Sequence, residues 1–246
     1  MFSPPSKELA CGMFNVSHLI SSVSCALIAI FLFIFLRKIS ERALLILTRA
    51  LAIFFSVLEI IKIVFKISIG EGKYIDHWMP LFFCSLFIYA LVMCGFGKGM
   101  IKNIGCTFLT LGSVVAGMIF LIFPTTSLPD YPIYHFISIH SMLFHTSMIL
   151  VGLIYIYKGY VRPCKDSFFE YAIIVCIPIA ASLILNPIFS SNLMIISNPV
   201  NIPVDFVNAI YELSPLLYKV LVILLYLTVP YFGNALVQFI IKKFQR

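Results

Sequence analysis

The sequence predicts an all-α fold, a polytopic membrane helical bundle of seven transmembrane helices that forms one domain over residues 1–246. The chain is 61% hydrophobic and only 11% charged, whereas a soluble domain is nearer half apolar and a quarter charged. Its mean hydropathy is +1.06, and its apolar runs are long enough to cross about 30 Å of hydrocarbon. A soluble protein is therefore excluded, and we expect a multi-pass protein of the cell membrane.

The apolar runs predict each span in chain order. The first run is followed by Arg37 and Lys38 and shows no small-residue cleavage site, so it predicts a retained helix and not a signal peptide. The later runs are bounded by short polar or basic segments. The predicted spans cover residues 16–36, 43–69, 79–96, 101–123, 133–157, 168–186 and 215–241.

Basic residues predict the orientation of the bundle. The net charge of +7 is concentrated in alternate loops and at the C-terminus, so it indicates topology and not nucleic-acid binding. By the positive-inside rule the C-terminus is cytoplasmic and the N-terminus is outside. The residues that carry this signal are Arg37, Lys38, Arg42, Arg49, Lys98, Lys102, Lys158, Arg162, Lys165, Lys242, Lys243 and Arg246.

Prolines support the same boundaries. Pro80, Pro132 and Pro215 are each predicted in the first turn of a span, where a missing N–H group costs little. Pro178 and Pro230 are predicted inside spans, which they should kink. The seven cysteines do not predict a disulfide scaffold, because most of them lie within or at the edges of spans.

Titratable groups recur in the outer half of three spans. At about 1.5 Å per residue, Glu59 lies about 15 Å and Lys62 about 10 Å below the predicted outer boundary. Cys84 lies roughly 8–10 Å below it, and His140 and His145 about 10 and 18 Å below it. Because polar groups in a membrane usually face a bundle interior or a wet cavity, the matched depths predict one polar pocket that opens outward.

Plainer interpretations of these residues remain open. Glu59 and Lys62 are three residues apart and can neutralise each other, and Cys84 can be a small apolar filler. His140 and His145 are about 140° apart around a helix, so they should not both face one centre, whereas Ser141 shares a face with His145. His77 precedes Cys84 by about 10.5 Å along one helix, too far to act as its base.

Three motifs carry a resemblance to a known family. The first is "MPLFFC", Met79 to Cys84; the second is Phe123-Pro124 followed by "HSMLFH", His140 to His145. The third is "LNPIFSSNLMII", with Asn186 and Asn192, in which the usual glycine is absent and Pro187 replaces an aromatic residue. Together they resemble the YwaF-type integral membrane proteins, which are distantly similar to a vertebrate multispanning phospholipid acyltransferase. In that relative the matching cysteine is the proposed nucleophile, and the matching histidine here is His145 or His140.

The first hypothesis is a membrane enzyme, a lipid acyltransferase or an acyl hydrolase that forms a thioester. Cys84 would attack an acyl ester, and His145 or His140 would serve as base and then as acid. Glu59 would orient the imidazole, and Asn192 or Lys62 would stabilise the oxyanion. Ser141 and Asn186 complete the predicted pocket. Membrane lipids are the expected environment and the possible substrate.

The second hypothesis is a binding or transport protein that holds a small solute or ion in the same pocket. No internal repeat of the transporter kind is visible in the sequence. A metal site formed by Cys84 and two histidines is a weaker interpretation, because the spacing matches no closed zinc motif. We therefore expect no cofactor and no metal, and the sequence does not indicate an oligomeric state.

Overall fold

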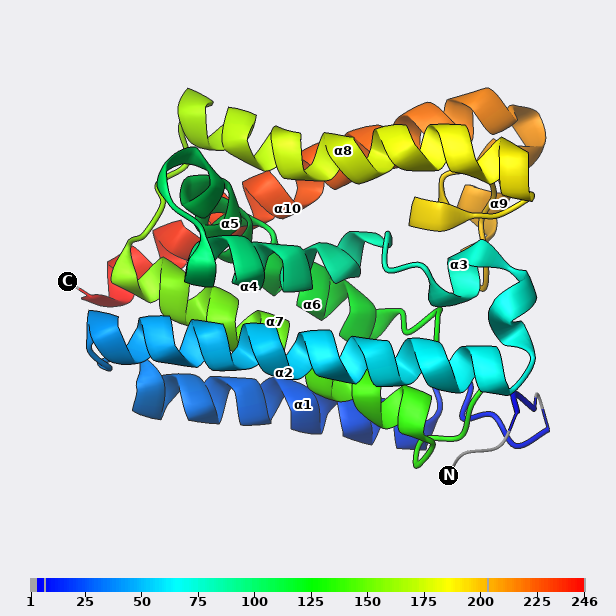
Figure 1. Cartoon of the computed structure of the whole chain (residues 1–246), viewed down its shortest axis with the longest axis horizontal. Coiled ribbons are helices and arrows are strands. Elements are labelled where there is room, and N and C mark those ends of the chain that lie inside the picture. The colour runs from blue at the N-terminus through cyan, green and yellow to red at the C-terminus, as the bar shows by residue number, and fades with distance from the viewer. Residues whose placement is uncertain (1–3, 7, 203, 246) are drawn as a thin grey trace.

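The fold is an all-helical bundle, seen in a computed structural model that describes residues 4–6, 8–202 and 204–245 (Figure 1). Asn15 and Ser40 cap the first two long helices, because each side chain accepts a hydrogen bond from a backbone N–H of the first turn. The α-helices are α1 (Val16–Leu36), α2 (Glu41–Ser68), α3 (Ile75–Trp78), α4 (Leu86–Phe96), α5 (Gly99–Leu111), α6 (Ser113–Ile122), α7 (Phe136–Lys158), α8 (Lys165–Phe189), α9 (Asp205–Leu213) and α10 (Pro215–Gln245). The short 3₁₀ turns are η1 (Glu71–Lys73), η2 (Phe83–Ser85) and η3 (Leu193–Ile195).

The all-α polytopic prediction is confirmed. Over the described residues, six helical segments are long and apolar enough to cross a membrane, or up to seven if α5 and α6 together form one span. The first predicted span coincides with α1, and the other predicted boundaries lie within a few residues of the observed ones. The start of α1 and the end of α10 lie at opposite ends of the bundle (Figure 1).

The third span is broken. Residues 75–78 form α3, the chain is then extended, and helix resumes at η2 and α4. Pro80 explains the break, since the residue before a proline is driven out of the helical region, and Met79 has φ −76° and ψ 123°. The prediction that Pro80 lies in the first turn of a helix is therefore wrong. Pro132 likewise precedes its helix, whereas Pro215 is the first residue of α10.

The fourth span is bent by 43° between α5 and α6. Gly112 lies at the bend, and a Cβ atom there would come within 2.9 Å of the Phe108 ring. The carbonyl of Leu111, next to the bend, accepts a hydrogen bond of 2.7 Å from the side-chain amide of Asn234 in α10. A neighbouring helix thus supplies a hydrogen bond at the bend, as a membrane interior requires.

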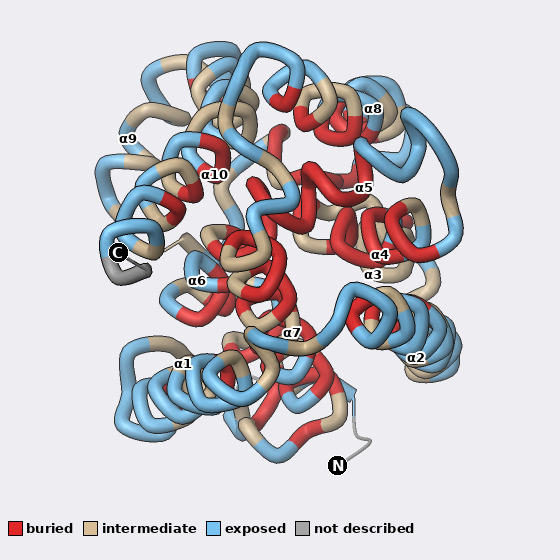
Figure 2. The backbone as a smooth tube through the Cα atoms, turned by 90° about the vertical axis from the view of Figure 1, so that its left-hand side faces the viewer, coloured by how far each residue is buried: buried red, intermediate tan, exposed pale blue. Residues whose placement is uncertain are grey.

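Helix α7 occupies the middle of the bundle, and α1 and α2 lie at its periphery (Figure 2). The main core contains buried apolar side chains of α2, α4, α5, α7 and α8, and a smaller cluster joins α1, α6 and α7. The outward faces of α1, α2, α8 and α10 expose large apolar side chains. Such a surface suits hydrocarbon and not water.

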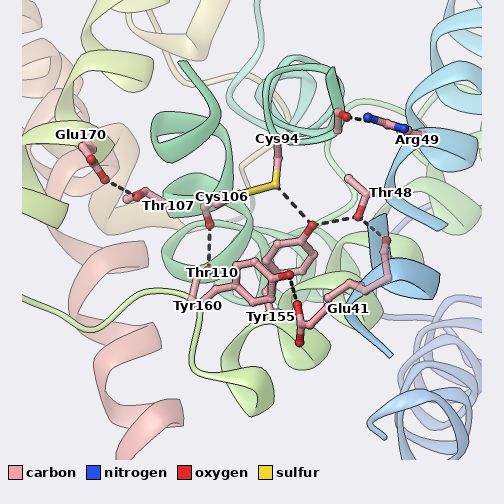
Figure 3. Close-up of a disulfide and its surroundings, with 12 residues drawn as sticks. Glu41, Thr48, Arg49, Cys94, Cys106, Thr107, Thr110, Tyr155, Tyr160 and Glu170 are labelled. Carbon is pink, nitrogen blue, oxygen red and sulfur yellow. Dashed lines mark hydrogen bonds between the residues drawn. A yellow bond between two sulfur atoms is a disulfide. The ribbon is translucent and has the colours of Figure 1, made fainter. Parts of the chain in front are cut away.

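A disulfide joins Cys94 of α4 to Cys106 of α5, near the turn between the two helices (Figure 3). The hydroxyl of Tyr155 in α7 lies 3.3 Å from the Cys94 sulfur and 2.8 Å from the hydroxyl of Thr48 in α2. The sequence does not predict this bond, because the pairing depends on how α4 packs against α5. It ties α4 and α5 together at the end of the bundle that lies away from α3 and α9.

Candidate functional site

A cavity of about 680 Å³ lies among α2, η2, α6, α7 and α10. It reaches the end of the bundle that carries α3, the loop after α6 and the segment between α8 and α10. This is the end predicted to face outward. The predicted site residues that line it are Glu59, Lys62, Cys84, His140, Ser141, His145 and Asn192.

Glu59 connects two of these helices. One carboxylate oxygen lies 2.6 Å from Nζ of Lys62, one turn further along α2, and the other lies 3.6 Å from Nε2 of His140 in α7. Glu59 and His140 are buried, while Lys62 is partly exposed. Glu59 therefore pairs with Lys62, as the plainer interpretation predicts, and it also contacts a histidine, as the site interpretation predicts.

His145 has a defined tautomer when neutral. Its Nδ1 lies 2.7 Å from the Ser141 carbonyl oxygen, which can only accept, so Nδ1 carries the hydrogen. Nε2 is then left with a lone pair, and this buried atom has no hydrogen-bond partner among the residues that the structure describes. The Phe120 ring lies against the imidazole, with centroids 3.5 Å apart. A buried imidazole with a free Nε2 beside a cavity has the features of a general base.

His140 and His145 both line the cavity, and this does not require that they point at one centre. A cavity of about 680 Å³ is wide enough for two side chains about 140° apart on α7 to reach its wall. Within the described part of the chain, neither ring nitrogen of His140 has a hydrogen-bond partner, and the Glu59 carboxylate, 3.6 Å from Nε2, is a longer ionic contact.

Cys84 lies in η2, immediately before α4, where the broken third span becomes helical again. Broken membrane helices commonly place a helix N-terminus at a binding site, because the partial positive charge there favours anionic groups. The preceding Phe83 stacks on Tyr226 of α10, with centroids 4.9 Å apart. The break therefore places Cys84 in the wall of the cavity.

Asn186 does not line the cavity, and this predicted pocket role is not met. Its buried side chain instead holds the loop after α8: it accepts from the backbone N–H of Leu193 and the hydroxyl of Ser191, and it donates to the Leu193 carbonyl. Asn192 lines the cavity, but its amide donates to Asn198 and its oxygen accepts from the Ser197 N–H. With these bonds in place, Asn192 has no free donor group aimed at an oxyanion.

A second polar cluster, which the sequence does not predict, lies at the end of the cavity nearest α3. One carboxylate oxygen of Glu71 accepts a hydrogen bond of 2.9 Å from the Tyr131 hydroxyl, and the other forms an ion pair with Nζ of Lys66, 2.9 Å away, and lies 3.6 Å from Nδ1 of His77. Burial raises the pKa of the Glu71 carboxyl, but Lys66, Tyr131 and His77 together outweigh burial, so this pKa falls below its ordinary value of 4.5. His77 thus belongs to the mouth of the cavity, and its partner comes from the turn after α2.

Among the described residues, no three His, Cys, Asp or Glu side chains are grouped closely enough to hold a metal ion. The two histidines and Cys84 share the cavity wall but do not form such a group. The weaker metal-site interpretation therefore finds no support in this part of the chain.

Comparison with known proteins gives one match. The family model described as the TMEM164 family matches residues 13–230, which includes every residue of the cavity wall. No curated protein and no solved structure shows significant similarity to the chain. The narrower resemblance to YwaF-type proteins and to an acyltransferase stays a prediction.

Proposed function

The chain belongs to the TMEM164 family, a multispanning membrane family, and from this premise we propose that it transfers or hydrolyses acyl groups of membrane lipids at the cavity. One observation carries the proposal. Cys84 and two buried histidines line the same cavity within the lipid-facing bundle, and Nε2 of His145 has no hydrogen-bond partner among the described residues. A thiol and an imidazole with a free lone pair are the two parts that thioester chemistry needs.

In the first step the Cys84 sulfur attacks the carbonyl carbon of a lipid ester. The thiol proton passes to Nε2 of His145, the C–S bond forms, and the ester C–O bond breaks. The same imidazole then returns the proton to the departing alkoxide. The result is an acyl thioester on Cys84 and a lipid with one chain fewer.

In the second step a hydroxyl group, from another lipid or from water, attacks the thioester. His145 accepts the hydroxyl proton, a C–O bond forms, and the C–S bond breaks. The proton then passes from the imidazole to the sulfur, which restores the thiol. A lipid acceptor gives acyl transfer, and water gives hydrolysis.

The neighbouring groups assist by charge and position. Glu59 lies 3.6 Å from His140 and stabilises positive charge on that ring, and Lys62 balances the carboxylate at 2.6 Å. The Ser141 carbonyl holds His145 in the tautomer that leaves Nε2 free. Lys62 and the N-terminal turn at α4 are the groups best placed to favour the developing oxyanion.

The test is acyl labelling in membranes with an alkyne-tagged fatty-acyl phospholipid, followed by hydroxylamine, which cleaves thioesters. We expect hydroxylamine-sensitive label on Cys84, and its loss in Cys84→Ala. Cys176→Ala is the matched control, because Cys176 is exposed on α8 and does not line the cavity. Label that persists in Cys84→Ala would contradict the proposal, and saturable binding of a small solute without label would favour the transport alternative.

A further inference from the structure

The cavity has a side wall made of exposed apolar residues. Ile119 of α6 is 44% exposed, and Leu225 and Val229 of α10 are 53% and 39% exposed. All three line the cavity. A side chain that is exposed and also lines the cavity lies at an opening, and these three lie on helices within the apolar bundle. The opening therefore faces the side of the bundle.

The two helices meet below this opening. A Cβ atom added to Gly233 of α10 would lie 2.7 Å from Val115 of α6, so the backbone of α10 approaches α6 closely there. Asn234, the next residue, donates to the Leu111 carbonyl at the bend before α6. This contact closes the gap between the helices at the inner end. Towards the outer end, α6 and α10 border the cavity.

The opening is also closed at the outer end. The side-chain amide of Asn201 donates to the Thr125 carbonyl, 3.2 Å away, and so joins the loop before α9 to the segment after α6. Val200 and Ile202 of this loop line the cavity as well. The opening is therefore a window bounded at both ends. We call it the α6–α10 window and define it by Ile119, Leu225 and Val229.

The window leads to both candidate reacting groups. On the α6 side, Phe120 follows Ile119 and stacks on His145. On the α10 side, Tyr226 follows Leu225 and stacks on Phe83, the residue before Cys84. A hydrocarbon chain that enters through the window passes between these two aromatic contacts. Cys84 lies beside the contact of Tyr226, and His145 lies beside Phe120.

The walls of the window suit a hydrocarbon chain. The charged groups of the cavity lie elsewhere, at Glu59 and Lys62 on α2 and at the outer end. The outer end carries Asp76, Asp130 and the Glu71 cluster, which consists of Lys66, Glu71, His77 and Tyr131. A bilayer lipid has the same arrangement, a polar headgroup outside and apolar chains deeper in the membrane. We propose that the α6–α10 window admits a lipid acyl chain sideways from the bilayer, while the headgroup stays at the outer end. The inference rests on the proposed function only for the chemistry that follows entry.

The test uses photocrosslinking in the full-length protein carrying Cys84→Ala, so that the result does not depend on catalysis. A benzophenone amino acid replaces Val222, which lines the cavity and is partly buried, or Leu224, which is 49% exposed and does not line it. The protein is placed in phosphatidylcholine vesicles whose acyl chains end in an alkyne. We expect acyl crosslinks at both positions, because Leu224 contacts bulk lipid and Val222 contacts a chain inside the cavity.

Blocking the window distinguishes crosslinks to bulk lipid from crosslinks to an acyl chain inside the cavity. Ile119→Trp should abolish the crosslink at Val222 and leave that at Leu224 unchanged. Met118→Trp is the matched control, since Met118 is the preceding residue of α6, is also exposed and does not line the cavity. A second blocking variant, Leu225→Trp, covers the case in which Ile119→Trp fails to fold.

Two results would overturn the inference. One is no crosslink at Val222 while Leu224 is crosslinked, which would mean that no chain enters. The other is a crosslink at Val222 that survives both tryptophan variants, which would mean entry by another route. Neither result depends on thioester formation at Cys84, so failure of the window and failure of the proposed chemistry remain distinguishable.

Discussion

The Phe120 ring lies 6° from parallel to the imidazole of His145, with centroids 3.5 Å apart. Stacking on one face and the Nδ1 hydrogen bond to Ser141 fix the ring plane, so that its free Nε2 keeps one position. The contact joins α6 to α7 in the wall of the cavity. It makes Phe120 a positioning residue for the proposed base.

Replacing Phe120 with leucine should slow thioester formation about 3- to 10-fold, because an aromatic pair contributes about 0.5–1.5 kcal/mol beyond its buried area. The measurement is the rate of hydroxylamine-sensitive labelling of Cys84. Phe108→Leu is the control, since Phe108 is a buried core residue of α5 that does not line the cavity. It should lower stability and leave the labelling rate of the folded protein unchanged. Equal rates in Phe120→Leu and wild type would remove the positioning role.

Removing Glu59 should destabilise the bundle more than removing both partners of its ion pair. Glu59→Gln leaves Lys62 without its counter-charge in an apolar span, and breaking a buried pair costs about 3–5 kcal/mol. Because Lys62 is partly exposed, we expect the lower end of this range. The double variant Glu59→Gln/Lys62→Met should recover at least half of the loss, measured as thermal stability in detergent. A double variant as unstable as the single one would contradict this.

The Glu71 cluster should make stability depend on acidic pH. The pKa of Glu71 is lower in the folded state than its ordinary value of 4.5. At any pH above 4.5 the ionised carboxylate therefore stabilises the folded state in full. As the pH falls from this value through the folded-state pKa, the contribution is lost. We expect the thermal midpoint of the wild type to approach that of Glu71→Gln on acidification. A constant difference between the two from pH 7 to pH 3 would refute the assignment.

Asn186→Ala should loosen the loop after α8 without removing a group from the cavity. Its side chain makes three hydrogen bonds to Ser191 and Leu193, and a buried polar group left unsatisfied costs about 1–3 kcal/mol. The loop is strained as well, since Met194 and Ile195 have φ values of 59° and 52°. We expect lower thermal stability and faster proteolysis within residues 190–204. Leu183→Ala, on the exposed face of the same helix, is the control and should change neither.

Two free cysteines at opposite ends test the orientation. Cys164 is exposed just before α8, and hydrogen bonds with Ser167 lower its thiol pKa, which favours reaction with maleimides. Cys11 lies at the other end, next to the start of α1. With the N-terminus outside, a membrane-impermeant maleimide should label Cys11 in intact cells and Cys164 only in inverted vesicles. Labelling of Cys164 in intact cells and of Cys11 only in inverted vesicles would contradict the predicted topology. The variants Cys11→Ser and Cys164→Ser show which cysteine carries the label in each experiment.

The helices were predictable because apolar length alone decides what can span a bilayer. The residues 16–36 of the first predicted span are the residues of α1. The sequence did not predict the break at Pro80, because a proline is compatible with the first turn of a helix as well as with an extended segment. The extended segment from Met79 also depends on the tertiary contact between Phe83 and Tyr226. The sequence did not predict the bend at Gly112, because apolar residues continue on both sides of it and no change in hydropathy marks the position.

The meeting of Glu59, Cys84, His140 and His145 at one cavity was predictable from depth, since all four were placed in the same half of the membrane, where polar groups tend to face a common interior. Their partners were not. The contacts of Phe120 with His145 and of Tyr131 with Glu71 join residues far apart in the sequence. Asn186 and Asn192 match a motif, but the motif does not distinguish a residue that lines a cavity from one that shapes the loop beside it.

The break in the third span bears on how the protein enters the membrane. Helix α4 has 11 residues and covers only about 16 Å of a hydrocarbon layer about 30 Å thick. Beyond it, backbone groups lack helical partners; the Pro80 carbonyl, for example, accepts a hydrogen bond from the Tyr89 hydroxyl. Lipid cannot supply such partners. During biosynthesis this segment should therefore stay at the insertion machinery until α6, α7 and α10 have been synthesised, which would make the C-terminal helix a checkpoint for release into the bilayer.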